Sequence, residues 1–202
     1  STACFGDASM FSFHATKVYH TIEGGAICYH NEELGRELYK LRDFGIKDAE
    51  TIDGVGSNAK MNEFVAAMGL CTLRHVDGEI AKRKAVYECY MENLANVEGL
   101  QLPPVQKDVQ SNYAYFPIII DEKKFGATRN EVFAKLAENN IHARKYFYPL
   151  TNAFDAYHGK FDPNATPVAL HLSKRVLTIP MFADLPLEDV KRISEIIKSV
   201  KQ

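Results

Sequence analysis

Lys17 is the residue whose type and surroundings are best suited to chemistry. It follows a short apolar run, lies near the hydroxyls of Ser12 and Thr16, and precedes a glycine pair at 24–25. A neutral lysine amine forms a Schiff base with an aldehyde cofactor, and hydroxyls and backbone N–H groups bind phosphate. The segment is therefore a candidate covalent cofactor site. A plain strand, loop and strand with an ordinary loop lysine is the alternative reading of the same residues.

Other reactive side chains do not cluster in the sequence. No histidine, cysteine and acidic residues have metal-ligand spacing, so we expect no metal centre. The cysteines lack CxxC spacing, which is typical of reduced thiols in a cytosolic protein. They are Cys4, Cys28, Cys71 and Cys89.

The composition is that of an ordinary globular protein, with 46% hydrophobic and 25% charged residues in 202. A net charge of −2 indicates no nucleic-acid or anionic-membrane surface. No apolar run approaches the ~18 residues of a membrane helix, and we expect no signal peptide. We expect a cytoplasmic protein. Because the chain enters an apolar run almost at once after Ser1, we also expect that further sequence precedes it in the parent protein.

The elements that must position Lys17 are two short strands, predicted over 8–13 and 25–30. Asn31 is a candidate N-cap for a helix over 32–43, whose leucines share one face. Residues 44–61 are polar and rich in glycine, and a loop of this length is usually functional or disordered.

One long helix is predicted from Asn62 to about Asn96, with bends at Gly69 and at Asp77-Gly78, because glycine weakens a helix interior. The second half of the chain alternates strands and helices, which indicates a small α/β layer. Strands are expected over 113–120, 141–148 and 176–180, and helices over 128–138, 168–174 and 186–200. The first of these helices begins with a capping-box sequence.

These elements predict an α/β protein that divides near residue 100. Residues 1–100 are expected to form one side of a larger α/β domain that ends in the long helix. Residues 101–202 are expected to form a small, separate α/β domain.

Several segments together resemble a known family. They are SFHATK followed by EGGAI, LRDFG at 41–45, GSNAKMNEFVAAMGL at 56–70, NYAYFPI at 112–118, and the stretch from YFYPL to LTIPM at 146–181. The sequence is identified as a member of the DegT/DnrJ/EryC1/StrS sugar aminotransferases. These are fold-type I enzymes that use pyridoxal 5′-phosphate (PLP). Within the family, it is most similar to enzymes that make dTDP-4-amino-4,6-dideoxyglucose.

The resemblance implies roles for particular residues. Lys17 matches the lysine that forms the Schiff base with PLP and then moves protons. Ser12 matches the hydroxyl that binds the cofactor phosphate. Asn58 and Lys60 match a segment that reaches the partner subunit's cofactor site, which implies a homodimer with shared active sites. The alternative explanation is that Asn58 only forms a turn and that Lys60 is only a charged residue on the surface.

Three residues are weaker candidates for contact with the sugar nucleotide. His14 lies three residues before the lysine, although a local packing role is the favoured explanation for it. Tyr146 and Tyr148 are on a predicted strand, where aromatic residues more often belong to the core. Glu23 is expected to order the turn rather than to touch substrate.

The sequence also departs from the family pattern. Thr151 follows Pro149-Leu150 where many members carry histidine, which puts any substrate contact by that histidine in doubt. The family's aspartate for the pyridine nitrogen, its ring-stacking aromatic residue and its glycine-rich phosphate turn all precede its lysine. Only sixteen residues precede Lys17 here, so these groups are expected outside this chain.

The reaction implied by the resemblance is transfer of an amino group from glutamate to a 4-keto-6-deoxy sugar nucleotide. The expected acceptor is dTDP-4-keto-6-deoxyglucose, used for surface polysaccharide such as O-antigen. A 3-aminotransferase is an alternative within the family. Related dehydratases carry histidine at the lysine position, and Lys17 argues against their chemistry. A catalytically inert fragment or dimerisation piece is the alternative outside enzymes.

Overall fold

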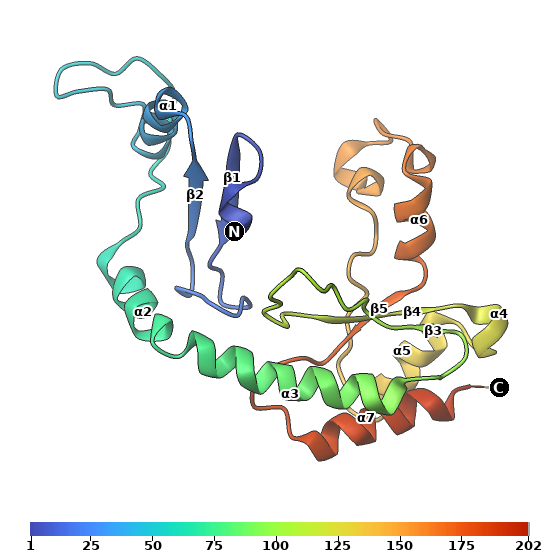
Figure 1. Ribbon diagram of the computed structural model, residues 1–202. Helices are drawn as coiled ribbons and strands as arrows, with labels where there is room; N and C mark the ends of the chain where they lie inside the picture. Colours follow the sequence, from blue (N-terminus) through green and yellow to red (C-terminus); the bar gives the residue numbers. More distant parts are fainter. Residues whose placement is uncertain (202) are drawn as a thin grey trace. The chain divides into compact units, whose positions relative to one another are not determined.

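The computed structural model describes residues 1–201 of the chain. Its helices and strands divide into two compact units, Ser1–Asp77 and Gly78–Gln202 (Figure 1). The mixture of helices and sheet agrees with the expected α/β class.

A pair of antiparallel strands forms the start of the first unit. Strand β1 (Ala8–Ser12) pairs with β2 (Gly25–Tyr29), and Ser12 lies opposite Gly25. This pairing confirms the two strands predicted on either side of Lys17.

Helix α1 (Glu32–Arg42) follows β2, as predicted. The Asn31 side chain accepts hydrogen bonds from the N–H groups of Glu33 and Leu34, at 2.8 and 3.2 Å. These bonds satisfy donors that have no partner within the helix. Residues 44–61 then form the predicted loop, in which only isolated β-bridges occur.

The single long helix predicted after this loop is wrong. The structure has two helices, α2 (Glu63–Leu73) and α3 (Val76–Leu94). Between them the His75 N–H donates to the Thr72 carbonyl at 3.0 Å, a bond from residue i to residue i−3. That tighter turn replaces the regular helical bond and ends α2.

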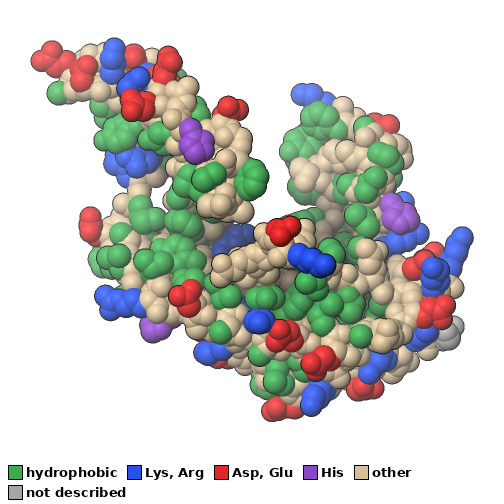
Figure 2. Space-filling model, in the orientation of Figure 1, with side chains coloured by type: hydrophobic (Ala, Val, Ile, Leu, Met, Phe, Trp, Pro, Cys, Tyr) green, Lys and Arg blue, Asp and Glu red, His purple; other side chains and the backbone are tan. Residues whose placement is uncertain are grey.

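The first unit has no buried apolar core. Within residues 1–77 no hydrophobic side chain is buried, and every buried hydrophobic residue of the described chain lies at or beyond Val86. Helix α2 exposes Phe64, Leu70 and Leu73 by 88%, 65% and 59%. Figure 2 shows hydrophobic side chains on the visible surface around this helix. Stabilisation by apolar burial is therefore concentrated in the second unit.

The second unit is built on a three-stranded antiparallel sheet in the order β3–β4–β5. The strands are β3 (Leu100–Gln101), β4 (Phe116–Ile120) and β5 (Val176–Ile179). Helices α3, α5 (Arg129–Glu138) and α7 (Leu187–Ser199) pack against it (Figure 1). Its largest fully buried side chains include Tyr90, Leu94, Phe116, Ile118, Ile120, Phe125, Leu136, Leu177 and Ile197.

The predicted capping box of α5 is present. Glu131 accepts hydrogen bonds from the Thr128 N–H and hydroxyl, at 2.6 and 2.7 Å, and these bonds lower the pKa of the Glu131 carboxyl. Helix α6 (Pro167–Ser173) confirms the helix predicted before β5, and α4 (Glu122–Phe125) was not foreseen. Short 3-10 turns lie at η1 (Thr2–Cys4), η2 (Thr151–Ala153), η3 (Asp155–Tyr157) and η4 (Pro163–Ala165).

The boundary between the compact units lies before most of α3, because this helix contributes to the core of the second unit. Val86, Tyr90 and Leu94 are at most 1% exposed among the sheet and helix residues of that core. The predicted domains, 1–100 and 101–202, differ from these compact units. They stay a prediction about the fold of the whole parent protein.

Strand β4 starts later than the predicted strand over 113–120. The Tyr113 N–H donates to the Ser111 hydroxyl at 3.0 Å, and Tyr113 has a φ of 51°. A positive φ is incompatible with an extended strand, so regular pairing starts only at Phe116.

The strand predicted over 141–148 is wrong. Arg144 forms only an isolated bridge with Thr178, through bonds of 2.8 and 2.7 Å. The next bonded pair of such a ladder would use the Val176 carbonyl. That carbonyl instead accepts a bond from the Arg129 guanidinium at 3.0 Å.

The four cysteines carry free thiols, and Cys89 is buried. Between residues 1 and 201, no three His, Cys, Asp or Glu side chains gather as a metal site requires. Over the same residues, each helix is too short or too polar to cross a membrane.

Candidate active site

The loop that carries Lys17 is closed by hydrogen bonds at its base. The Phe13 N–H donates to the Gly24 carbonyl at 2.8 Å, and the Phe13 carbonyl accepts from the Thr21 N–H at 2.9 Å. Within the loop, the Lys17 N–H donates to the His14 carbonyl at 2.9 Å. Strand pairing therefore extends into the loop and fixes where Lys17 leaves the sheet.

Helix α2 supports this loop from its other side. The Thr72 hydroxyl donates to the His20 carbonyl at 2.8 Å. A Cβ atom at Gly69 would lie 2.8 Å from Thr21 Cγ2 and 2.9 Å from the Tyr19 hydroxyl. Because Thr21 is only 1% exposed, glycine is needed here for the close approach of helix and loop.

This contact corrects the predicted role of two glycines. Gly69 lies inside α2 and Gly78 lies inside α3, so neither is a bend. Gly78 would have no atom within 4 Å of an added Cβ, whereas Gly69 is a packing position against the loop.

The glycine pair after the loop is required by its surroundings. A Cβ at Gly24 would lie 2.3 Å from Thr21 Oγ1, and one at Gly25 would lie 2.7 Å from the Phe11 carbonyl oxygen. The Thr21 hydroxyl donates to the Glu23 carbonyl at 2.6 Å. The Thr21 hydroxyl thus holds the turn through the Glu23 backbone carbonyl, and the ordering role of the Glu23 side chain stays a prediction.

The Lys17 amine and the Ser12 hydroxyl remain available to a ligand. Lys17 is partly buried, and among residues 1–201 its ammonium has no hydrogen-bond or ion-pair partner. The exposed Ser12 oxygen accepts a long bond from the His14 N–H, at 3.4 Å, so its own hydrogen is free for a phosphate oxygen. An amine without a protein partner among residues 1–201 and a donor hydroxyl are thus five residues apart on one segment.

His14 belongs to a local polar network. Its Nδ1 lies 3.0 Å from the Thr16 hydroxyl, and its Nε2 lies 3.7 Å from Glu23 Oε1. These contacts orient the ring toward the turn. They support the local role weighed for His14, and its contact with substrate stays a prediction.

Asn58 and Lys60 are near the end of the 44–61 loop in the sequence. In the folded chain both contact Asp43, the residue just before the loop begins. Asn58 forms a β-bridge with Asp43, and its side chain accepts a bond from the Lys60 N–H at 3.4 Å. The Lys60 ammonium pairs with the Asp43 carboxylate and lies 4.6 Å from the centre of the Phe44 ring. The loop therefore holds Lys60 through both charge and cation–π contact.

Tyr146 and Tyr148 belong to the second unit and lie outside any regular strand. The Tyr146 hydroxyl accepts a bond from Arg144, and its ring is 6.0 Å from that of Tyr115. Tyr148 is 54% exposed, and the Arg129 guanidinium lies 5.2 Å from its ring centre. Neither ring is part of the buried core, contrary to the usual fate of aromatic residues on a strand.

Comparison with known proteins decides the family. Residues 2–198 match the DegT/DnrJ/EryC1/StrS aminotransferase family. The chain belongs to this family. The dTDP-4-amino-4,6-dideoxy-D-glucose transaminase of Shigella dysenteriae is 37% identical over 196 residues, which are 97% of this chain and 53% of that protein.

Solved structures of family members agree. DesI, crystallised in the presence of its TDP-sugar product, is 31% identical with a TM-score of 0.89 over 98% of this chain and 50% of that one. Spr1654 of Streptococcus pneumoniae, in its PMP form, is 25% identical with a TM-score of 0.84 over 96% of this chain and 53% of that one. The expected resemblance and fold are confirmed. The chain spans about half the length of the curated relatives it matches.

The structure brings the predicted residues of this DegT-family chain together in groups. Ser12, His14 and Lys17 share one segment, and Asn58 lies beside Lys60 on another. Sequence reasoning missed that Asp43 holds Lys60, although the LRDFG segment was noted. It also missed Thr72, whose only signal was its place on the helix that follows the long loop.

Proposed function

We propose that the parent protein is a PLP-dependent sugar-nucleotide aminotransferase and that Lys17 is its cofactor-binding lysine. The main support for this proposal is the environment of Lys17. Its loop is held by backbone hydrogen bonds, while its amine has no protein partner among residues 1–201. Family membership supports the same reading. So does the PMP form of the relative Spr1654.

The residues present fit the cofactor. The Lys17 amine binds its aldehyde, and the Ser12 hydroxyl donates to its phosphate. PLP, when bound, supplies an electron sink for the substrate carbanion. The Lys17 Nζ then moves a proton as a general base and acid, since it is the basic group at the attachment point. The turn at Gly24 keeps the loop at a fixed distance from β1.

The second proposed feature is a homodimer with shared sites. Asn58 and Lys60 are exposed at the end of their loop, and the Lys60 side chain is 44% exposed while it pairs with Asp43. We assign Lys60 to the cofactor phosphate of a partner subunit, with Asn58 beside it. The proposed parent fold places 1–100 in the cofactor-binding domain and 101–202 in the small domain.

The proposed reaction moves an amino group from glutamate to the C4 ketone of dTDP-4-keto-6-deoxyglucose in the cytoplasm, for surface polysaccharide such as O-antigen. The names of two relatives support a dTDP-sugar: the S. dysenteriae transaminase makes a dTDP-amino sugar, and DesI was crystallised with a TDP-sugar product. His14, Tyr146 and Tyr148 are the proposed contacts to the sugar nucleotide.

Absorbance spectroscopy tests the cofactor proposal. Adding PLP to the chain is expected to give a visible band that Lys17→Ala abolishes. The matched control is Lys107→Ala, which removes an exposed loop lysine and should leave the band unchanged. If no band forms, or if Lys17→Ala keeps it, the chain acts as an inert or dimerisation piece.

Substrate assays then test the reaction with the full-length protein. Glutamate with dTDP-4-keto-6-deoxyglucose should yield 2-oxoglutarate and a dTDP-amino sugar, both detectable by mass spectrometry. Turnover of the 3-keto isomer alone would favour the 3-aminotransferase. Loss of turnover in Lys17→Ala with retained dimerisation would separate catalysis from assembly.

A further inference from the structure

A pocket of about 460 Å³ lies on the second unit, where β3, β4, α4 and the turn between α6 and β5 meet. Its volume falls in the range of small-molecule sites, which is roughly 300–1,000 Å³. All of its lining residues lie between positions 99 and 175, and none is a candidate residue of the aminotransferase site. The pocket is therefore a separate feature of the molecule.

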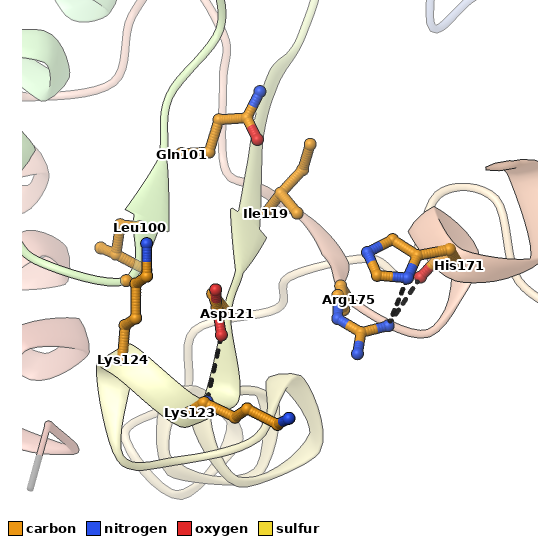
Figure 3. Close-up of a pocket in the computed structure, with 9 residues that line it drawn as sticks. Leu100, Gln101, Ile119, Asp121, Lys123, Lys124, His171 and Arg175 are labelled. Carbon is orange, nitrogen blue, oxygen red and sulfur yellow. Dashed lines mark hydrogen bonds between the residues drawn. The ribbon is translucent and has the colours of Figure 1, made fainter.

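The pocket gathers cations that lack acidic partners. Lys123 and Lys124 project from α4, and Arg175 lies in the turn before β5 (Figure 3). Among residues 1–201, none of the three forms an ion pair, although many other lysines of the chain do. Asp121 is the acidic group of the pocket, and its carboxylate accepts a bond from the Lys123 backbone N–H at 3.1 Å.

This arrangement favours an anion. Lys123, Lys124 and Arg175 face one carboxylate, Asp121, so the pocket has two positive charges in excess without counting His171. Like charges gathered in a concave site repel one another, and they raise the local concentration of anions. A bound anion would offset the repulsion among Lys123, Lys124 and Arg175.

Arg175 is held in place by its neighbour. Its Nη1 donates to the His171 carbonyl at 3.2 Å and lies 3.2 Å from His171 Nδ1, as Figure 3 shows. Because a guanidinium only donates hydrogen bonds, His171 Nδ1 accepts from Arg175, and Nε2 is the ring nitrogen that carries a proton. The pocket therefore offers an oriented guanidinium and an imidazole N–H, and such charged donors bind phosphate strongly.

The pocket also has an apolar part. Ile119 is partly exposed on β4, and Gln101 lies opposite it on β3, so the two side chains face the same side of the sheet, whereas Leu100 packs toward the core on the other side. A bare inorganic anion would leave these groups unused. We propose that this pocket binds a phosphorylated small molecule of about nucleotide size, with its phosphate on Arg175 and the lysines and its ring against Ile119 and Gln101.

NMR titration of the ¹⁵N-labelled chain tests the proposal. The probes are AMP, inorganic phosphate and succinate. AMP is expected to shift the amides of residues 99–101, 119–124 and 171–175 in a saturable way. It should bind about tenfold tighter than phosphate, the gain expected from burying roughly 55 Å² of apolar ligand surface. Equal binding of succinate and AMP, or shifts spread over lysines elsewhere, would overturn the proposal.

Variants locate the binding. Arg175→Gln is expected to weaken AMP binding about tenfold or more, because a charged hydrogen bond is lost. Lys124→Gln provides a second variant on an exposed side chain, so that it leaves the fold intact, and it should weaken binding and reduce its salt dependence. Lys107→Gln removes the same charge from an exposed loop and should bind AMP as the wild type does. Wild-type affinity in both Arg175→Gln and Lys124→Gln would contradict the site.

Discussion

The Lys60 ammonium pairs with the Asp43 carboxylate and so joins the two ends of the long loop. Backbone bonds reinforce this closure, since the Ala59 N–H donates to the Arg42 carbonyl at 2.9 Å and Phe44 N–H to the Ser57 carbonyl at 3.3 Å. The residue proposed to serve a partner's cofactor is thus positioned by its own loop, and Asp43 is a positioning residue.

Asp43→Asn tests this relationship. The pair is partly exposed, so its loss should cost at most about 1 kcal/mol of unfolding free energy. Lys60 would nevertheless become more mobile, and trypsin should cleave after it several-fold faster. Asp108→Asn, in an exposed loop of the second unit, is the control and should leave the cleavage rate unchanged. Equal cleavage in Asp43→Asn and the wild type would contradict the positioning role.

Gly69→Ala tests the support of the Lys17 loop by α2. The added methyl would contact buried Thr21, and the loop must shift to accommodate it. Hydrogen exchange at the Lys17 and Thr21 amides should accelerate several-fold, because both amides are bonded within the loop.

Gly78→Ala is the matched control for this variant. An added Cβ at Gly78 meets no atom within 4 Å, so the change should stabilise α3 by up to about 1 kcal/mol without altering exchange in the loop. Unchanged loop exchange in Gly69→Ala would show that the helix does not hold the loop.

Ile118→Ala tests where the apolar core lies. Ile118 is fully buried in β4, so its truncation should cost about 2–5 kcal/mol of unfolding free energy. Ile27→Ala makes the same change at a side chain that is 47% exposed in β2, and it should cost less than about 1 kcal/mol. Urea unfolding followed by circular dichroism measures both. Similar losses would contradict a core confined to the second unit.

The buried phenol of Tyr90 should make the free energy of unfolding depend on pH. Burial raises the pKa of its phenol, whose hydroxyl donates to the Pro180 carbonyl at 2.9 Å. The folded state therefore retains the proton longer than the unfolded state. The resulting stability is complete below the unfolded pKa of about 10 and falls as pH rises above it.

Unfolding free energies measured on either side of that pH check this expectation. Tyr90→Phe should cost about 1 kcal/mol at neutral pH for the lost hydrogen bond, and it should reduce the fall at high pH. Tyr39→Phe changes a tyrosine that is 56% exposed and should leave the fall in place. A fall of the same size in Tyr90→Phe would assign the alkaline sensitivity to other groups.

Local signals in the sequence predicted the elements that local chemistry determines. Asn31 and Thr128 are caps as expected, because their side chains bond to amides only two or three residues away. The end of α2 and the loss of the strand after Arg144 were not predictable in this way. No residue type marks the bond from the His75 N–H to the Thr72 carbonyl at the end of α2, and the Val176 carbonyl is bound by Arg129, which is distant in sequence.

In the candidate site, too, local sequence predicted some features and others became visible only in the folded chain. Motif and residue type were enough to make Lys17 and Ser12 candidates for the cofactor site, and their roles stay predictions. The Asp43–Lys60 pair and the packing of Gly69 against Thr21 required the folded chain, since no periodicity or spacing encodes them.

Covalent labelling of Lys17 tests directly whether this lysine binds PLP. The chain is incubated with PLP, reduced with borohydride and digested, and the labelled lysines are identified by mass spectrometry. The label is expected to concentrate on Lys17, ahead of exposed lysines such as Lys107. Label distributed over the exposed lysines and absent from Lys17 would contradict it.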